Sequence, residues 1–266
     1  MINVAVTGAS GRMGRRILHF LNQADDIKIV GAIEAPGHPA LGTDAGVVSG
    51  EGAIGVLIAS DLSEASADAD VIVDFTSPTA TLHNAQYAAA NSKSMVIGTT
   101  GFDEEERLML AHLAEGFPCV FAPNMSIGVN VMFEVTRKLA SILGEEYDVE
   151  IVEAHHALKA DSPSGTALGL GEAAAEGLGW DFPSVARYER YGKIGERGSK
   201  EIGIQSIRGG DIVGEHTVMF CGEGERIELT HRATTRDNFA KGVVRAVRWI
   251  HGKSPGLYSM KDVLEL

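Results

Sequence analysis

The chain has 266 residues, of which 44% are hydrophobic and 22% are charged, so it can build a sizeable core and lacks the composition of a disordered chain. Its 23 basic and 36 acidic residues leave a net charge of −13, which argues against nucleic acid or an anionic membrane as a partner. Since it has only 2 cysteines and no apolar run near the ~18 residues of a membrane span, we exclude a disulfide-stapled or membrane protein and expect a cytoplasmic one.

The first half of the chain alternates strand-like and helix-like stretches. Apolar, β-branched runs predict buried strands at 2–7, 27–33, 71–75 and 95–98. Helical spacing follows the first of these runs and predicts further helices at 79–91 and 103–115. Strands that alternate with helices form right-handed βαβ units, so we expect a parallel sheet covered on both faces.

The second half changes character. A helix-like stretch at 127–143 leads into a strand at 149–154, and another helix is expected to start at Ser164. Strand-like runs separated by glycine turn signals then follow at 202–207, 217–221 and 227–230. We interpret these runs as a mostly antiparallel sheet. Helical spacing returns from Phe239 to Ile250, and we expect this helix to pack on the first half of the chain.

A glycine-rich turn joins the first strand to the helix after it, with the sequence Gly8-Ala-Ser-Gly11-Arg-Met-Gly14. Glycines at such a turn let the backbone approach a pyrophosphate, and the helix N-terminus supplies N–H donors. The spacing G-x-x-G-x-x-G is a relative of the dinucleotide-binding fingerprint. Glu34, 20 residues beyond Gly14, can accept hydrogen bonds from both hydroxyls of an adenosine ribose. The alternative is an ordinary glycine-rich turn and a solvated carboxylate.

These features predict an α/β fold with a Rossmann-type parallel sheet domain and a smaller α+β domain whose sheet is mostly antiparallel. We expect residues 1–126 and 236–266 to form the dinucleotide-binding domain and residues 127–235 to form the second domain. Two more segments, Gly98-Thr-Thr100 and Ala122-Pro-Asn124, follow predicted parallel strands, where ligands lie in such folds. For the first of these segments, a turn and helix entry is the alternative.

The densest polar cluster is the segment from Glu153 to Thr166, with the sequence EAHHALKADSPSGT. Its two histidines and Lys159 supply a group that titrates near neutrality and a cation, which proton transfer and anion binding require. Ser164 suits the N-cap position, and the first N–H groups of its helix, with the Thr166 hydroxyl, would form a carboxylate pocket. One rival is a metal site formed by His155, His156, Asp161 and Glu153, which we disfavour because adjacent histidines on a strand point to opposite faces. The other is a polar loop before a capped helix.

The same segment closely resembles the signature of the 4-hydroxy-tetrahydrodipicolinate reductase family, which belongs to the lysine and diaminopimelate pathway. The resemblance covers essentially the whole chain, and the His-His-Lys and Pro-Ser-Gly-Thr run is its most specific part. The other matching segments are 8–14, 74–76, 98–102, 124–130, 208–216 and 256–263. This resemblance implies an NAD(P)H-dependent oxidoreductase with a Rossmann-type domain and no metal.

The resemblance also implies a role for each matched residue. It implies that His155 donates and accepts the proton, that Lys159 is a second proton donor, and that the substrate carboxylates bind to His156, Gly165 and Thr166. The implied cofactor contacts are Gly8, Ala9, Ser10, Gly11, Arg12 and Met13 at the pyrophosphate, Glu34 at the ribose, and Gly98, Thr99, Thr100, Ala122, Pro123, Asn124 and Met125 at the nicotinamide.

The implied reaction starts with loss of water from the 4-hydroxy ring of a small dicarboxylate. Hydride from NADH or NADPH and a proton are then added to the conjugated system. The family also implies a homotetramer joined through the sheets of the second domain, so that residues 127–235 serve in substrate binding and oligomerisation. Ala35 and Ser77 stand where some members carry an arginine, so we expect NADH to be used at least as well as NADPH.

Two other functions compete with this interpretation. Another two-domain dehydrogenase, acting on aspartate or homoserine, would share the glycine-rich turn and Glu34 but has no reason to carry the His-His-Lys and Ser-Gly-Thr cluster. A non-catalytic nucleotide sensor would have lost the proton-donor positions, which are intact at His155 and Lys159.

Overall fold

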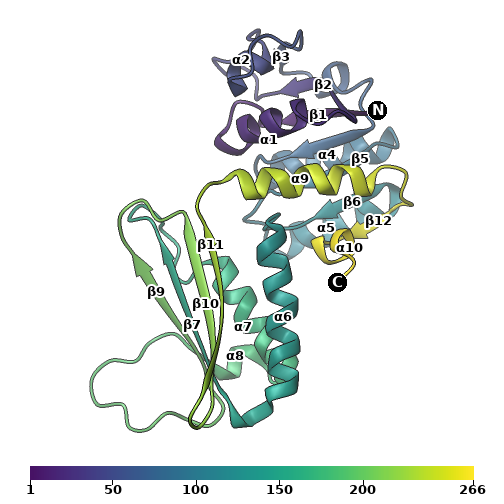
Figure 1. Cartoon of the computed structure of the whole chain (residues 1–266). Helices are drawn as coiled ribbons and strands as arrows, with labels where there is room; N and C mark the ends of the chain where they lie inside the picture. Colours follow the sequence, from purple (N-terminus) through teal and green to yellow (C-terminus); the bar gives the residue numbers. More distant parts are fainter. The chain divides into compact units, whose positions relative to one another are not determined.

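The computed structural model describes residues 1–266, which fold into two compact units (Figure 1). The first unit is formed by residues 1–127 and 236–266, and the second by residues 128–235. Both ends of the chain therefore belong to the first unit. The helix expected from Phe239 onward is α9 (Asp237–Ile250), and it lies in this unit.

A seven-stranded sheet forms the centre of the first unit. Its strands are β1 (Ile2–Thr7), β2 (Ile27–Ile33), β3 (Ile58–Ala59), β4 (Val71–Asp74), β5 (Ser94–Ile97), β6 (Pro118–Phe121) and β12 (Gly256–Tyr258). They lie in the order β12-β6-β5-β4-β1-β2-β3, and every neighbouring pair is parallel. The Rossmann-type sheet expected from the sequence is confirmed. The chain winds to one side of β1 through β2 and to the other side through β4.

Helices cover both faces of this sheet. They are α1 (Arg12–Asn22), α2 (Ala45–Ser49), α3 (Leu62–Ala65), α4 (Pro78–Ala90), α5 (Glu104–Leu113), α9 and α10 (Met260–Leu264). Because successive strand residues point to opposite faces, Val73 packs in one core with Val247 of α9, while Ile72 packs in another with Ala85 of α4 and Leu110 of α5. Neither the helices of this unit nor those of the other are long and apolar enough to cross a membrane.

A five-stranded sheet in the order β11-β10-β7-β9-β8 forms the second unit. Its strands are β7 (Asp148–His155), β8 (Ala186–Arg187), β9 (Ile202–Arg208), β10 (Gly214–Cys221) and β11 (Arg226–Ala233). The sheet is mixed: β10 runs antiparallel to β7 and β11, as the sequence led us to expect, whereas the parallel pairing of β9 with β7 and β8 was not expected. After β7, helix α7 (Gly165–Leu178) carries the chain back along the sheet, so that β9 starts at the same end as β7.

The helices α6 (Ile127–Leu143) and α7 lie on one face of this mixed sheet, and the short α8 (Phe182–Val185) follows α7 (Figure 1). Ile151 of β7, Val218 of β10 and Leu170 of α7 share one apolar core there. By the alternation along the strands, Glu153 and its cross-strand partner His216 point to the same face. This helix-facing surface therefore changes from apolar to polar towards the end of β7.

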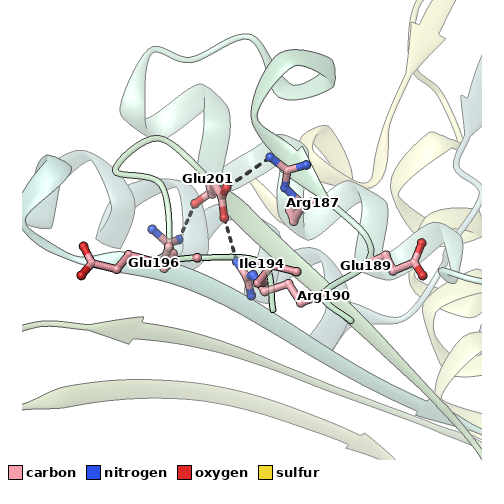
Figure 2. Close-up of a pocket in the computed structure, with 8 residues that line it drawn as sticks. Arg187, Glu189, Arg190, Ile194, Glu196 and Glu201 are labelled. Carbon is pink, nitrogen blue, oxygen red and sulfur yellow. Dashed lines mark hydrogen bonds and ion pairs between the residues drawn. The ribbon is translucent and has the colours of Figure 1, made fainter. Parts of the chain in front are cut away.

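A long connection, residues 188–201, joins β8 to β9 and is tied by ion pairs to Glu150 and Asp148 of β7, on the face of the sheet away from the helices. Figure 2 shows the ion pairs that Glu201, at the end of this connection, makes with Arg187 and Arg190. Arg190 donates to both oxygens of Glu150, at 2.7 and 2.8 Å, and to Glu201 at 3.1 Å. Gly203 leaves the space for this pair, since a Cβ there would lie 1.9 Å from Glu150 Oε2. The connection borders a cavity of about 400 Å³. Its three arginines are already paired, Arg187 and Arg190 with Glu201 and Arg197 with Glu150 and Asp148.

Candidate active site

A cleft of about 1110 Å³ opens at the carboxyl ends of β1, β2 and β4 in the first unit. It lies where the chain connections diverge from β1, the place at which ligands bind in open parallel sheets. Gly8, Ser10 and Gly11 of the glycine-rich turn line it, together with Glu34 and Phe75. The structure thus brings together the turn and the acidic residue that the sequence singled out.

The glycines of the turn allow close packing that a side chain would prevent. Gly8 has φ +68, and a Cβ there would lie 2.7 Å from the carbonyl oxygen of Phe75. A Cβ on Gly14 would lie 2.0 Å from the carbonyl oxygen of Gly8, so α1 can start directly against the turn. Gly98 has a similar role, because its Cβ would lie 2.1 Å from the ring of Phe75.

Glu34 holds the turn at the rim of the cleft. Its Oε1 accepts hydrogen bonds from the Ser10 backbone N–H and from the Ser10 hydroxyl, both at 2.7 Å. His38 lies beside this pair, with Nε2 3.5 Å from Ser10 Oγ and Nδ1 accepting a hydrogen bond from the backbone N–H of Ala40. Sequence reasoning did not place His38 in the cleft. The sequence offered one clue to this placement, which is that His38 stands four positions after Glu34.

The other predicted cofactor residues lie in different surroundings. Gly98–Thr100 and Ala122–Met125 follow β5 and β6, and they are not among the residues that line the cleft. Arg12 is exposed at the start of α1 and Pro123 is also exposed, whereas Ala9 and Met125 are buried in the core that α9 covers. Buried side chains leave only the backbone for contact with a ligand.

Thr99 belongs to a buried network around Asp74 that the sequence did not reveal. Asp74 Oδ1 accepts hydrogen bonds from the hydroxyls of Thr76, Thr81 and Thr99, and Asp74 Oδ2 accepts one from Asn84. The Thr99 hydroxyl also accepts a hydrogen bond from the Thr76 backbone N–H. The network ties the ends of β4 and β5 to α4, beneath the cleft wall that Phe75 and Thr76 form.

In the second unit, a buried carboxylate gathers the polar side chains near the end of β7. Glu153 is 0% exposed, and its Oε2 lies 2.6 Å from His155 Nδ1. Arg208 of β9 donates to both Glu153 oxygens, at 2.7 and 2.8 Å. The backbone N–H of Ser164 donates to Glu153 Oε1 at 3.1 Å. Sequence reasoning named Glu153 only as a ligand of the disfavoured metal site and quoted Arg208 only as part of a motif, because pairing between strands is invisible in sequence order.

The start of α7 has the N-cap that the sequence predicted. The Ser164 hydroxyl accepts a hydrogen bond from the backbone N–H of Ala167, and it lies 3.0 Å from Nε2 of His216. Gly165 leaves this helix start open, since no atom lies within 4 Å of the position a Cβ would take. Thr166 is half-buried in the same turn. The start of α7 is therefore open at Gly165, where the first backbone N–H groups of a helix lack partners within the helix.

Lys159 lies in the loop between His156 and Ser164, but it is not a lone cation. Its ammonium donates to both oxygens of Asp161, at 2.8 and 2.9 Å. The backbone of the same loop is fixed by Arg208, which donates to the carbonyl oxygen of Asp161 at 2.7 Å. His156, just beyond β7, is half-buried and accepts a turn hydrogen bond from the Lys159 N–H at its carbonyl.

The surroundings shift the pKa values of this cluster. Burial alone would raise the pKa of Glu153, but hydrogen bonds from Arg208, His155 and Ser206 lower it to about 2. Burial lowers the pKa of His155, against the opposite effect of the Glu153 carboxylate. Burial also lowers the pKa of His216 to about 4, and the charge of His155 acts in the same direction. The site thus combines an ionised carboxylate with imidazoles that resist protonation.

Comparisons with known proteins match both units to one family. Residues 2–125 match the family profile "Dihydrodipicolinate reductase, N-terminus", and residues 128–264 match "Dihydrodipicolinate reductase, C-terminus". Proteins named 4-hydroxy-tetrahydrodipicolinate reductase from Citrifermentans bemidjiense and Geotalea uraniireducens are each 55% identical to this chain over 266 residues, 100% of both chains. A solved structure of a dipicolinate-bound dihydrodipicolinate reductase from Paenisporosarcina sp. TG-14 is similar with a TM-score of 0.76 and 27% identity, and the match covers 98% of each chain.

We predict that His216 makes the second unit sensitive to acid. Its pKa is about 4 in the folded chain against an ordinary 6.5, so between these values the unfolded chain binds more protons. The resulting stability is fully present above pH 6.5 and is lost as pH falls towards 4. Between pH 6.5 and pH 4, the free energy of unfolding of His216→Asn should fall by up to about 3 kcal/mol less than that of the wild type. Urea titration at each pH measures this free energy. His112→Asn, at an exposed site, is the control and should leave the slope unchanged. An equal slope in wild type and His216→Asn would contradict this account.

Proposed function

This chain belongs to the dihydrodipicolinate reductase family, and on that premise we propose that it reduces 4-hydroxy-tetrahydrodipicolinate, with loss of water, in an NAD(P)H-dependent step of lysine biosynthesis. The observation that carries the proposal is the convergence of His155, Arg208 and the start of α7 on the buried Glu153. The match along the whole chain argues against the competing aspartate-type dehydrogenase and against a nucleotide sensor.

The cleft of the first unit fits a dinucleotide. The turn at Gly8 and Gly14 carries no side chain that would keep a pyrophosphate away, and the N-terminus of α1 directs N–H groups towards it. Glu34 is the acceptor for ribose hydroxyls. When bound, the reduced nicotinamide supplies a hydride. For its nicotinamide end we propose Gly98–Thr100 and Ala122–Met125, which follow neighbouring strands of the same sheet.

The substrate is a small dicarboxylate, and we assign its carboxylates to the N-terminus of α7. Gly165 and Thr166 offer backbone N–H groups, a hydroxyl and open space, and the positive end of the helix dipole favours an anion there. His156 contributes from the end of β7. The name of the Paenisporosarcina structure reports bound dipicolinate, a planar dicarboxylate, which supports this substrate class.

We assign the proton transfer to His155, with Lys159 as a second donor. Hydride addition to an unsaturated imine builds negative charge on the imine end and its carboxylate, and a nearby cation stabilises that charge more in the transition state than in the ground state. Lys159 can supply this cation. Since its ammonium is held by Asp161, a substrate carboxylate must compete with Asp161 for it.

We further propose that the protein assembles as a homotetramer through the second unit. The face of the mixed sheet away from α6 and α7 carries partly exposed apolar side chains, among them Val152, Met219 and Ile207, and Ile207 is 52% exposed. A second copy of the chain covering this face would remove these side chains from water.

One assay tests the activity directly. The substrate is made in situ by the preceding synthase, and the loss of NADH absorbance is followed after this protein is added. We expect oxidation of NADH that depends on both the synthase and this protein. Oxidation that is absent with NADH and with NADPH would overturn the proposed function.

We predict that Lys159→Ala lowers kcat by about 10²–10³-fold and changes the NADH Kd little. The reason is that the variant removes a charge-assisted donor from the second unit and leaves the glycine-rich turn intact. Steady-state kinetics and NADH fluorescence titration measure the two quantities. Lys200→Ala, which breaks an exposed ion pair with Glu145 in the same unit, is the matched control and should keep wild-type kcat. A wild-type kcat in Lys159→Ala would remove Lys159 from the mechanism.

Pyridine-2,6-dicarboxylate should bind in the presence of NADH and compete with the substrate. Thr166→Val should weaken its binding by about 1–3 kcal/mol, because a hydroxyl donor to a carboxylate is lost. Isothermal calorimetry measures both affinities. Ser184→Ala removes a hydroxyl from α8, outside the cluster, and should bind as the wild type does. If calorimetry detects no binding to the wild type, the assignment of the carboxylates to α7 fails.

NADH should be used at least as well as NADPH. The 2′-phosphate of NADPH would lie against the Glu34 carboxylate, and Ala35, Pro36 and Gly37 offer no cation to offset it. Ala35→Arg should therefore lower the KM for NADPH with little effect on NADH, whereas Ala35→Leu adds bulk without charge and should not. The measurement is kcat/KM for both cofactors. A wild-type preference for NADPH above about tenfold would contradict the prediction.

A further inference from the structure

Glu153 is a buried charge to which the proposed mechanism gives no step. It is 0% exposed, yet it lies two residues from His155 on the same face of β7. A buried carboxylate without donors is costly, so the hydrogen bonds that it accepts from His155, Ser164 and Arg208 account for its presence. These hydrogen bonds explain how the charge of Glu153 is tolerated, but not which neighbouring residue needs Glu153 for its own function.

An ionised carboxylate has no proton to donate. At the 2.6 Å separation between Glu153 Oε2 and His155 Nδ1, the histidine must therefore be the donor. Hydrogen bonds from Arg208, His155 and Ser206 outweigh the effect of burial and keep the pKa of Glu153 near 2, so the carboxylate is ionised at neutral pH. Nδ1 of His155 then carries a proton in both the neutral and the charged form of the ring.

We propose that Glu153 is a positioning residue of this site, which fixes His155 in the Nδ1–H tautomer and leaves Nε2 as the atom that exchanges a proton with the substrate. The inference rests on the proposed function only for the proton transfer, since the tautomer is a property of the chain itself. Gly214 of β10 keeps the space at Nε2 open, because a Cβ there would lie 3.1 Å from that nitrogen.

The charges around His155 make this role electrostatic as well as geometric. Arg208 on β9 and Lys159 in the following loop both disfavour the imidazolium, and His216 on β10 stacks edge-on at 5.2 Å between ring centroids. Glu153 is the acidic group that opposes them from β7. Without its charge, the pKa of His155 falls further, and a proton donor with a lower pKa is less often protonated at neutral pH.

Glu153 also holds the loop between β7 and α7. A loss of activity in a Glu153 variant would therefore not tell whether Glu153 positions His155 or only stabilises this loop. Arg208 bridges Glu153 to the carbonyl oxygen of Asp161, and Ser164 links Glu153 to α7. The chain offers a matched control on the same strand. Glu150 accepts hydrogen bonds from Arg190 and Arg197, but it points to the opposite face of the sheet.

The direct test is solid-state ¹⁵N NMR of the full-length protein labelled at its histidine nitrogens, with His155 assigned through His155→Gln. At a pH where the ring is neutral, wild type should show His155 protonated on Nδ1 and unprotonated on Nε2. Protonation on Nε2 in the wild type would overturn the proposal without any variant or activity assay, and so independently of the proposed function.

Glu153→Gln keeps the side-chain shape and removes the charge. We expect its His155 to lose the single tautomer, its kcat to fall by about 10- to 100-fold, and the basic limb of its pH–rate profile to move to lower pH. The affinity for pyridine-2,6-dicarboxylate and the KM for NADH should stay within about threefold of wild type.

Glu150→Gln should keep the wild-type tautomer and pH profile. If Glu153→Gln keeps the wild-type tautomer and profile, or if Glu150→Gln moves them equally, Glu153 has a structural role only and the proposal is wrong. Should Glu153→Gln fail to fold, the wild-type spectrum decides alone.

Discussion

A carboxylate with no exposed surface needs a hydrogen-bond donor for each lone pair, and Glu153 finds its donors on segments far apart in the chain. His155 comes from the same strand, Arg208 from β9 and the Ser164 N–H from the start of α7. Removing Arg208 would leave the buried charge without its cation, which costs roughly 3–5 kcal/mol for a broken buried ion pair. The register of the mixed sheet, the loop before α7 and the orientation of the histidine are therefore coupled to one another through a single side chain.

The first unit meets a different constraint, which is steric. Its strand–turn–helix contact at Gly8 and Gly14 places backbone oxygens where a Cβ would lie, at 2.7 and 2.0 Å. Only glycine satisfies that spacing, and the same spacing lets a pyrophosphate approach the backbone. Asp74 then fixes the neighbouring loop ends from below through hydroxyl donors. Loop ends held rigidly by hydrogen bonds and a turn without side chains suit the binding of a long, flexible dinucleotide.

Charge is distributed unevenly in this acidic protein. The net charge of −13 would repel a dicarboxylate, yet the cluster near α7 places Arg208, Lys159 and a helix N-terminus together. Each cation is already paired, Arg208 with Glu153 and Lys159 with Asp161. The resting site is thus electrostatically balanced. In the function that we propose, an incoming carboxylate exchanges with Asp161, a partner that is exposed and readily resolvated.

The sequence by itself determined what depends on neighbours along the chain. The parallel sheet followed from β-branched runs alternating with helical spacing, the Ser164 cap from the residue before a helix, and the family from the run between Glu153 and Thr166. Only the tertiary structure decided what depends on residues brought together by folding. The parallel pairing of β7 with β9, the ion pair from Glu153 to Arg208 55 positions away, and the placing of Thr99 beneath the cleft are such cases. These contacts depend on which strands lie side by side and in which direction, and that arrangement joins segments far apart in the chain.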